Sequence, residues 1–156
     1  MYNVCKEHCR CYVKKMATIK EIENQIVEEF SIFDDWMDKY QYIIDLGKNL
    51  PVIEESEKKD ENLIKGCQSR VWLNCKEEDG LLYFSADSDA IITKGIISLL
   101  IRVYNGQSPK DILDSDLSFI ESIGLKENLS PTRANGLLSM IKQIKYYALA
   151  YAEKES

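Results

Sequence analysis

Two stretches near the start of the chain place apolar residues at the spacing of amphipathic helices. The first extends from Thr18, the cap residue of a capping-box pattern, to Phe30. The second extends from Asp34 to about Leu46, opens on acidic residues that suit a helix N-terminus, and is followed by a glycine that can end it. The run 54–61 that comes next is almost entirely charged, so we expect a solvated connection there.

The pattern then changes to the alternation that is typical of strands. Residues 70–76 alternate between apolar and polar positions, and a turn at 77–80 leads into a returning segment at 81–86, which predicts a hairpin. The apolar face of the first strand carries Val71, Leu73 and Cys75. A third short strand is expected at 63–65.

Helical spacing returns after the hairpin. Asp89 is expected to cap a largely buried helix from Ala90 to about Tyr104. Ser108 and Ser130 each precede a proline, which is the pattern of a capping hydroxyl followed by proline at the first helical position. Together these elements predict an α+β fold in which a small antiparallel sheet of about three strands is covered by helices.

The length and composition indicate one domain with a short extension. The chain has 156 residues, and residues 1–15 lack the periodicity of the rest. We predict a disordered N-terminal extension at 1–15 and a folded domain at 16–156, with Met16 resembling a natural start. No apolar run reaches the roughly 18 residues of a membrane span, and no secretory signal is visible, so we expect a soluble cytoplasmic protein without a membrane partner.

The net charge narrows the classes of partner. The formal charge is −6 at pH 7. Nucleic-acid binding draws much of its affinity from lysine and arginine contacts to phosphate, so this balance argues against nucleic acid as the main partner. An acidic chain is better suited to a protein partner with a basic patch, or to a small molecule.

The chain holds five cysteines and one histidine. An odd number of thiols in a reducing compartment favours reactive or structural roles over a disulfide framework. A cysteine–histidine catalytic pair in the folded domain is excluded unless the extension folds back, because the single histidine is His8. The extension carries the set Cys5, His8, Cys9 and Cys11. These residues have the chemistry to bind zinc or copper, but their spacing fits no common structural zinc site, so no metal site is predicted.

Cys67 is set apart by its surroundings, in the segment Gly66-Cys67-Gln68-Ser69 at the start of the first strand. Lys65 and Arg70 lie within three residues of it, and positive charge favours thiolate over thiol. Thiolate is the nucleophile in sulfur transfer, so the setting is suitable for attack on a persulfide. Taken alone, the segment leaves the interpretation as a structural cysteine open, since cysteine is often buried.

Several segments occur in a fixed order along the chain: Gly66-Cys67-Gln68-Ser69-Arg70-Val71-Trp72, Asp87-Ser88-Asp89-Ala90, Lys94-Gly95, Leu129-Ser130-Pro131-Thr132-Arg133 and Asn135-Gly136-Leu137. Together they resemble the SufE family of sulfur-acceptor proteins over roughly Ile19 to Ala150. The order and spacing of the segments make the match specific, which the short pattern around the cysteine would not be by itself.

The resemblance implies a fold like that of IscU-type scaffold proteins, with Cys67 on a loop at the edge of the sheet. It implies that Cys67 accepts sulfane sulfur from the persulfide of a SufS-type cysteine desulfurase, which stimulates the desulfurase. The sulfur then passes to a SufB-containing scaffold complex for iron–sulfur cluster assembly. Pyridoxal phosphate belongs to the desulfurase, so no cofactor is expected here. An acceptor paired with a CsdA-type desulfurase shares this pattern, so a desulfurase of that type is the alternative partner.

Further residues receive roles at this stage. Arg133, with Arg70, is a candidate for lowering the thiol pKa or for docking the partner, and a structural ion pair is the competing interpretation. Asp89 is a candidate for docking, which is compatible with a role as helix cap. The expected partner-contacting residues are Gly66, Gln68, Ser69, Asp87 and Asp89.

A carrier thiol must reach its partner, yet an exposed persulfide is open to reduction and oxidation. We therefore expect the loop 66–69 to hold Cys67 inward at rest, sheltered by Trp72, and to swing out when the desulfurase binds. Cys75 is expected in the core, with a role in resolving the Cys67 persulfide as the alternative. A cluster scaffold is disfavoured by the shortage of cysteine ligands, and a thiol redox protein by the absence of a Cys-x-x-Cys pair.

Overall fold

A computed structural model describes residues 17–155 of the chain. Seven α-helices and two strands are described: α2 (Ile19–Phe30), α3 (Trp36–Leu46), β1 (Val71–Glu78), β2 (Leu81–Ser88), α4 (Ile91–Tyr104), α5 (Pro109–Asp114), α6 (Phe119–Ser122), α7 (Leu125–Asn128) and α8 (Pro131–Glu155). Three short 3₁₀ helices precede the hairpin: η1 (Gly47–Asn49), η2 (Glu55–Glu57) and η3 (Asp60–Asn62). The predicted division at residues 15 and 16 stays a prediction, because that boundary and the Cys5–Cys11 segment lie outside the described residues.

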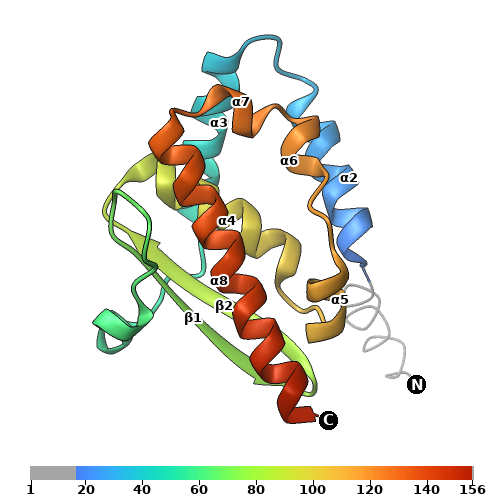
Figure 1. Ribbon diagram of the computed structural model, residues 1–156. Helices are drawn as coiled ribbons and strands as arrows, with labels where there is room; N and C mark the ends of the chain where they lie inside the picture. Colours follow the sequence, from blue (N-terminus) through green and yellow to red (C-terminus); the bar gives the residue numbers. More distant parts are fainter. Residues whose placement is uncertain (1–16, 156) are drawn as a thin grey trace, which may run out of the picture.

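The α+β architecture is confirmed, with helices packed around a hairpin (Figure 1). The sheet of the described chain has two strands rather than about three. They pair antiparallel from Val71 opposite Ser88 to Glu78 opposite Leu81, so both strands are longer than predicted. Leu63 forms only an isolated bridge to Trp72. The segment around Leu63 is therefore a connection along the sheet edge and not a third strand.

A two-residue turn closes the hairpin at Asp79 and Gly80. Both residues have positive φ, 54° and 82°, as in the primed turns whose twist matches that of the flanking strands. This turn is shorter than the predicted one at 77–80, because the ladder continues to Glu78.

The predicted helix starts are confirmed at three positions. The Thr18 hydroxyl accepts from the Glu21 N–H, and the Glu21 carboxylate accepts from the Thr18 N–H, which completes the capping box. Ser108 and Ser130 cap α5 and α8 by accepting the N–H groups three residues on. These caps fix where each helix begins.

The start of α4 differs from the prediction. Its N-cap is Ala90, which makes no side-chain cap bond. The Asp89 carboxylate accepts instead from the backbone N–H of Arg70, at 3.1 Å. Asp89 is thus a link between the two ends of the hairpin, and its expected role as helix cap is wrong.

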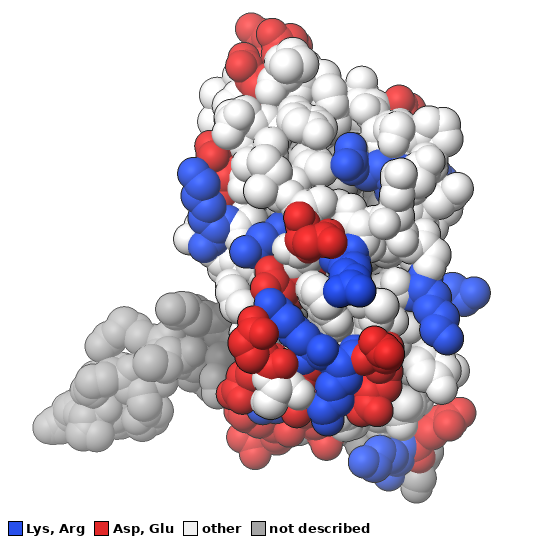
Figure 2. Space-filling model, turned by 90° about the vertical axis from the view of Figure 1, so that its left-hand side faces the viewer, with Lys and Arg blue, Asp and Glu red and all other residues white. Residues whose placement is uncertain are grey.

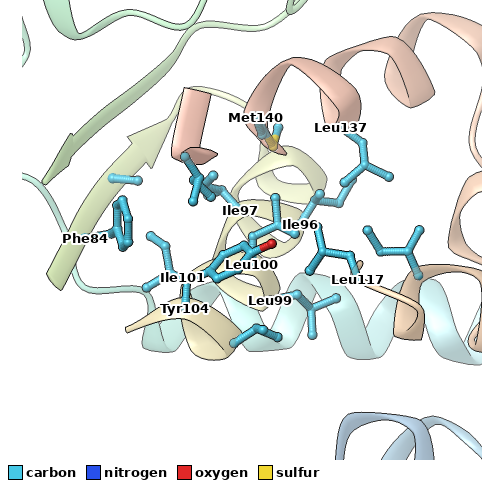
Figure 3. Close-up of a cluster of buried hydrophobic side chains, with 14 of the residues drawn as sticks. Phe84, Ile96, Ile97, Leu99, Leu100, Ile101, Tyr104, Leu117, Leu137 and Met140 are labelled. Carbon is cyan, nitrogen blue, oxygen red and sulfur yellow. The ribbon is translucent and has the colours of Figure 1, made fainter. Parts of the chain in front are cut away.

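Helix α4 is the centre of the core. Ten of its fourteen residues are buried, as its apolar composition predicts. The cluster shown in Figure 3 joins Ile96, Ile97, Leu100 and Tyr104 of α4 to Phe84 of β2 and to Leu137 and Met140 of α8. Figure 1 shows α8 crossing α4, with the hairpin on one side and α5 and α6 on the other. The long helix α8 therefore contacts both the core and the segment that leads into β1.

Close packing of α3 on α4 depends on one glycine. A Cβ at Gly95 would collide with the carbonyl oxygen of Ile43, so any larger residue would push the helices apart. No helix among residues 17–155 combines the length and the apolar character needed to cross a membrane.

Candidate functional site

The loop before β1 is seated on α8 at two neighbouring points. Gly66 has a φ of +94°, a conformation that suits glycine, and a Cβ there would lie 2.5 Å from the Ser139 hydroxyl. The next residue, Cys67, points its thiol at the carbonyl oxygen of Gly136, at 3.7 Å. A Cβ at Gly136 would be 3.6 Å from the Cys67 sulfur, so the thiol lies directly on the helix surface. The loop is therefore held inward, with its cysteine against α8.

Cys67 is half-buried and lines a small pocket of about 20 Å³. The other lining residues are Gln68, Ser69, Thr93, Thr132, Arg133, Gly136 and Met140. This volume is enough for about one water-sized group. The shelter expected for Cys67 is thus present, but α4 and α8 provide it.

Trp72 does not line this pocket. The alternation of β1 places Trp72 on the face opposite to buried Val71 and Leu73, where the Lys58 ammonium lies 5.3 Å from the centre of its ring. The expectation that Trp72 shelters Cys67 is wrong for this reason.

Burial raises the pKa of the Cys67 thiol above its ordinary value. We expected Lys65, Arg70 and Arg133 to lower it, and for this conformation that expectation is wrong. Lys65 and Arg70 are exposed, where water screens their charge. Arg133 lines the pocket, yet loss of hydration of the thiolate is the only resolved influence on this thiol. Cys67 is accordingly a protonated thiol at neutral pH.

Arg133 makes no ion pair with another residue of the described chain. The competing interpretation as a structural ion pair thus finds no support between residues 17 and 155. Arg133 lines the pocket of Cys67, and its guanidinium makes no hydrogen bond within that part of the chain.

Asp87 is held in a network of charges. Its carboxylate accepts from Lys58 at 2.7 Å and from the Ser88 N–H at 2.8 Å, and it lies 3.3 Å from the Lys94 ammonium. Burial opposes ionisation, but these donors keep the pKa of the Asp87 carboxyl below its ordinary value. The side chain is only 14% exposed. Asp87 therefore positions its neighbours, and its expected role in partner binding would require it to act with Lys58 and Lys94.

The prediction of a solvated connection at 54–61 is confirmed for most of its length, since six of its eight residues are exposed, and Lys58 is an exception. The Lys58 side chain is 20% exposed and also pairs with Glu55 at 2.8 Å. Through its pair with Asp87, Lys58 attaches the segment before the cysteine loop to the end of β2. Asp89 attaches the segment after the loop by accepting from the Arg70 N–H. Two carboxylates on one short stretch anchor both ends of the chain that carries Cys67.

Cys75 is a core residue, as predicted. It is buried on the inner face of β1, and burial together with the nearby Glu77 raises the pKa of its thiol to about 12. The Tyr147 and Tyr151 hydroxyls donate to the carbonyl oxygens of Leu73 and Cys75. These bonds fix α8 along β1, and so position the helix that receives the Cys67 loop.

One face of the molecule carries charges of both signs (Figure 2). On the face shown in Figure 2, lysine and arginine side chains alternate with acidic ones in the lower half, and the upper part carries few charges. In residues 17–155, no group of three or more histidine, cysteine or acidic side chains is arranged to hold a metal ion.

The sequence did not reveal every residue of the site. Thr93, Thr132 and Met140 line the pocket but carry no chemistry that separates them from ordinary helix positions. The spacing of residues 132, 136 and 140, four positions apart, does predict that they share one face of α8. The sequence does not show that the cysteine loop lies on that face.

A half-buried thiol on a glycine-bearing loop, seated on the long helix of an α+β protein, defines a class of small cysteine-loop proteins. Comparisons with known proteins specify it further. The sequence model of the SufE family, described as "Fe-S metabolism associated domain", matches residues 24–148. An uncharacterized SufE-like protein of Rhizobium meliloti (strain 1021) is 42% identical over 127 residues, which cover 78% of this chain and 91% of that protein.

A second SufE-like protein, from Rhizobium etli, is 40% identical over 127 residues, covering 78% of this chain and 86% of its own length. The solution structure of a hypothetical protein from Thermus thermophilus superimposes with a TM-score of 0.69 at 19% identity, over 83% of this chain and 94% of that one. This structural likeness concerns the fold. The chain belongs to the SufE family, and that membership assigns it to iron–sulfur metabolism.

The raised pKa of Cys67 predicts slow alkylation. A thiol with a raised pKa stays protonated up to a higher pH. The rate at which iodoacetamide alkylates Cys67 should therefore begin to increase at a higher pH in the folded protein than in the chain unfolded in urea. We expect at least a several-fold lower rate than in urea at pH 7.5, measured peptide by peptide by mass spectrometry. Cys75 serves as the internal reference and should be slower still. A Cys67 rate above that of the unfolded chain would contradict the sheltered conformation.

Neutralising Asp87 should loosen the anchor of the cysteine loop. We expect Asp87→Asn to lower the free energy of unfolding by about 1–2 kcal/mol, because Lys58 loses a charged acceptor in a partly buried site. The lowered pKa of Asp87 means that its contribution is present above the pKa of the unfolded chain and is lost as pH falls through the folded value. Urea titrations at pH 7 and pH 3 should therefore differ less in the variant.

The matched control is Asp114→Asn, which removes an exposed pair with Lys110 at 2.9 Å. Exposed pairs contribute little, so stability at pH 7 should hardly change. Equal losses from the two substitutions would show that the Asp87 network has no special anchoring role.

Proposed function

We propose that this protein accepts sulfane sulfur on Cys67 from a cysteine desulfurase and carries it toward iron–sulfur cluster assembly. The observation that carries the proposal is the seat of Cys67: a half-buried thiol against Gly136, beside a pocket with room for about one water-sized group. A terminal persulfide sulfur is a group of about that size. Membership of the SufE family, which is associated with iron–sulfur metabolism, supports the same proposal.

The transfer is a thiol–disulfide type of exchange. The Cys67 thiolate attacks the outer sulfur of the donor persulfide, a new S–S bond forms on Cys67, and the electron pair of the broken bond leaves with the donor cysteine. No oxidant or reductant is consumed. Pyridoxal phosphate stays with the desulfurase in this proposal, and this chain contributes only the acceptor thiol.

The resting conformation does not favour that attack, since burial keeps Cys67 protonated. Release of the loop 66–69 from α8 would return the thiol to water and bring its pKa back toward the ordinary value. Reactivity then depends on the partner that displaces the loop. In the free protein the thiol stays protonated and sheltered, and in the complex with the partner it becomes a nucleophile. We place this reaction in the reducing cytoplasm.

The surface that surrounds the loop is our candidate for docking the desulfurase. Gln68 and Arg70 are exposed, and Arg133 has no ion pair within the described chain. An arginine beside the emerging thiol can stabilise the thiolate that forms. A SufS-type desulfurase as donor and a SufB-containing scaffold as receiver complete the proposed route.

Mass spectrometry after incubation with a SufS-type desulfurase and cysteine tests the proposal. We expect a mass increase of about one sulfur atom, about 32 Da, on the peptide that contains Cys67, together with several-fold faster sulfide release by the desulfurase in the presence of a reductant. Cys67→Ser should abolish both effects.

The matched control is Cys75→Ala, which removes the other cysteine of the described domain. It should keep sulfur on Cys67 if it remains folded, as judged by circular dichroism. A Cys67→Ser protein that still stimulates sulfide release would contradict the carrier mechanism.

A further inference from the structure

A second hollow lies next to the cysteine loop, on the side of Gly66. It is a groove of about 460 Å³ between the segment 60–65 and the middle of α8. Its polar lining comes from Asp60, Glu61, Lys65, Ser139, Lys142, Gln143 and Tyr146. Small-molecule sites are commonly concave and of about 300–1,000 Å³, so the groove has the size of a site for a small ligand.

Most polar side chains of this groove are unused within the described chain, and Glu61 is the exception because it pairs with Lys59 at 4.0 Å. Lys65, Lys142 and Gln143 make no side-chain hydrogen bond or ion pair with any residue between 17 and 155, and the same holds for Ser139 and Tyr146. Tyr146 is 65% exposed although it is a large aromatic residue. Convergent polar groups without partners, beside an exposed aromatic ring, are typical of a binding site rather than of packing.

The groove is lined by side chains of both charges. Lys65 on one wall and Lys142 on the other offer ammonium groups to a carboxylate, and Asp60 and Glu61 offer carboxylates to an ammonium. Leu63 adds an apolar part between them. A ligand with both a carboxylate and an amino group fits this lining better than a purely anionic one does.

The groove ends one helical turn from the reactive thiol. Ser139 lines it and also touches Gly66, while Gly136, three residues earlier on α8, touches Cys67. Three residues of α-helix rise about 4.5 Å. A ligand lying in the groove with its sulfur toward Ser139 would reach Cys67 once the loop moves by about this distance.

We propose that this groove binds a zwitterionic low-molecular-weight thiol, of the size of cysteine or a short γ-glutamyl peptide, as a second receiver of sulfur from Cys67. The role in transfer rests on the proposed function of Cys67. Binding itself does not, because it needs only the groove.

The transfer balances without a further reactant. The ligand thiolate attacks the outer sulfur of the Cys67 persulfide and forms an S–S bond with it. The bond to the Cys67 sulfur breaks, and its electron pair stays on Cys67, which takes up a proton. The ligand leaves as a hydropersulfide.

Binding is tested with S-methylglutathione, which has the charges but cannot react. The full, unloaded chain is titrated and followed by backbone NMR. We expect shifts at Lys65, Ser139, Lys142 and Tyr146 that saturate at millimolar ligand, and a tenfold or greater loss of affinity in Lys142→Glu. The control Lys126→Glu has the same charge change at an exposed position on α7 and should bind as the wild type does. Absence of shifts in the groove, or equal loss in both variants, would overturn the proposal.

Transfer is tested in a single turnover. The desulfurase first loads sulfur onto Cys67 and is then removed. The loaded protein is mixed with glutathione, and the glutathione hydropersulfide that forms is trapped with monobromobimane. Loss of sulfur from Cys67 should be several-fold slower in Lys142→Glu than in Lys126→Glu. Equal rates would overturn the role in transfer. A chain that never loads would instead refute the proposed function, and the NMR titration would still decide whether the groove binds.

Discussion

The contact between the cysteine loop and α8 is the constraint on which the chemistry proposed for this protein depends. Gly66 and Cys67 lie on α8 where Gly136 and Ser139 leave room for them. This seat removes the thiol from water, raises its pKa and closes the pocket around it. The raised pKa at rest follows from this packing arrangement, and our proposal of a partner that displaces the loop is built on it.

The rest of the fold holds that seat in place. α4 fills the core and gives α8 a fixed support, and tyrosine hydroxyls of α8 donate to the backbone of β1. Asp87 and Asp89, at the end of β2, hold the chain on either side of the loop. The Ile64 N–H also donates to the Val71 carbonyl at 2.8 Å, which leaves residues 65–69 between these attachments. The arrangement combines a well-anchored frame with one short segment whose release we propose, and the adjoining groove extends the same surface.

Much of this could be predicted from the sequence, for identifiable reasons. Capping residues such as Thr18, Ser108 and Ser130 act locally, so the helix starts followed from them. The order of segments around Cys67 indicated the family. The pKa of Cys67 was predicted in the wrong direction, because nearness in sequence to Lys65 and Arg70 says nothing of burial by a helix 69 residues further on. The role of Asp89 was missed for the same reason, since its partner is the backbone of Arg70 across the hairpin.

Hydrogen exchange of the loop 66–69, measured with and without a SufS-type desulfurase, tests the central claim most directly. If the desulfurase lifts Cys67 from α8, amide protection in the loop should fall on binding, together with that of the facing turn of α8 around Gly136. The buried strand β1 should keep its protection and serves as the internal reference. Unchanged protection in the loop, under conditions where the complex is fully formed, would contradict the account.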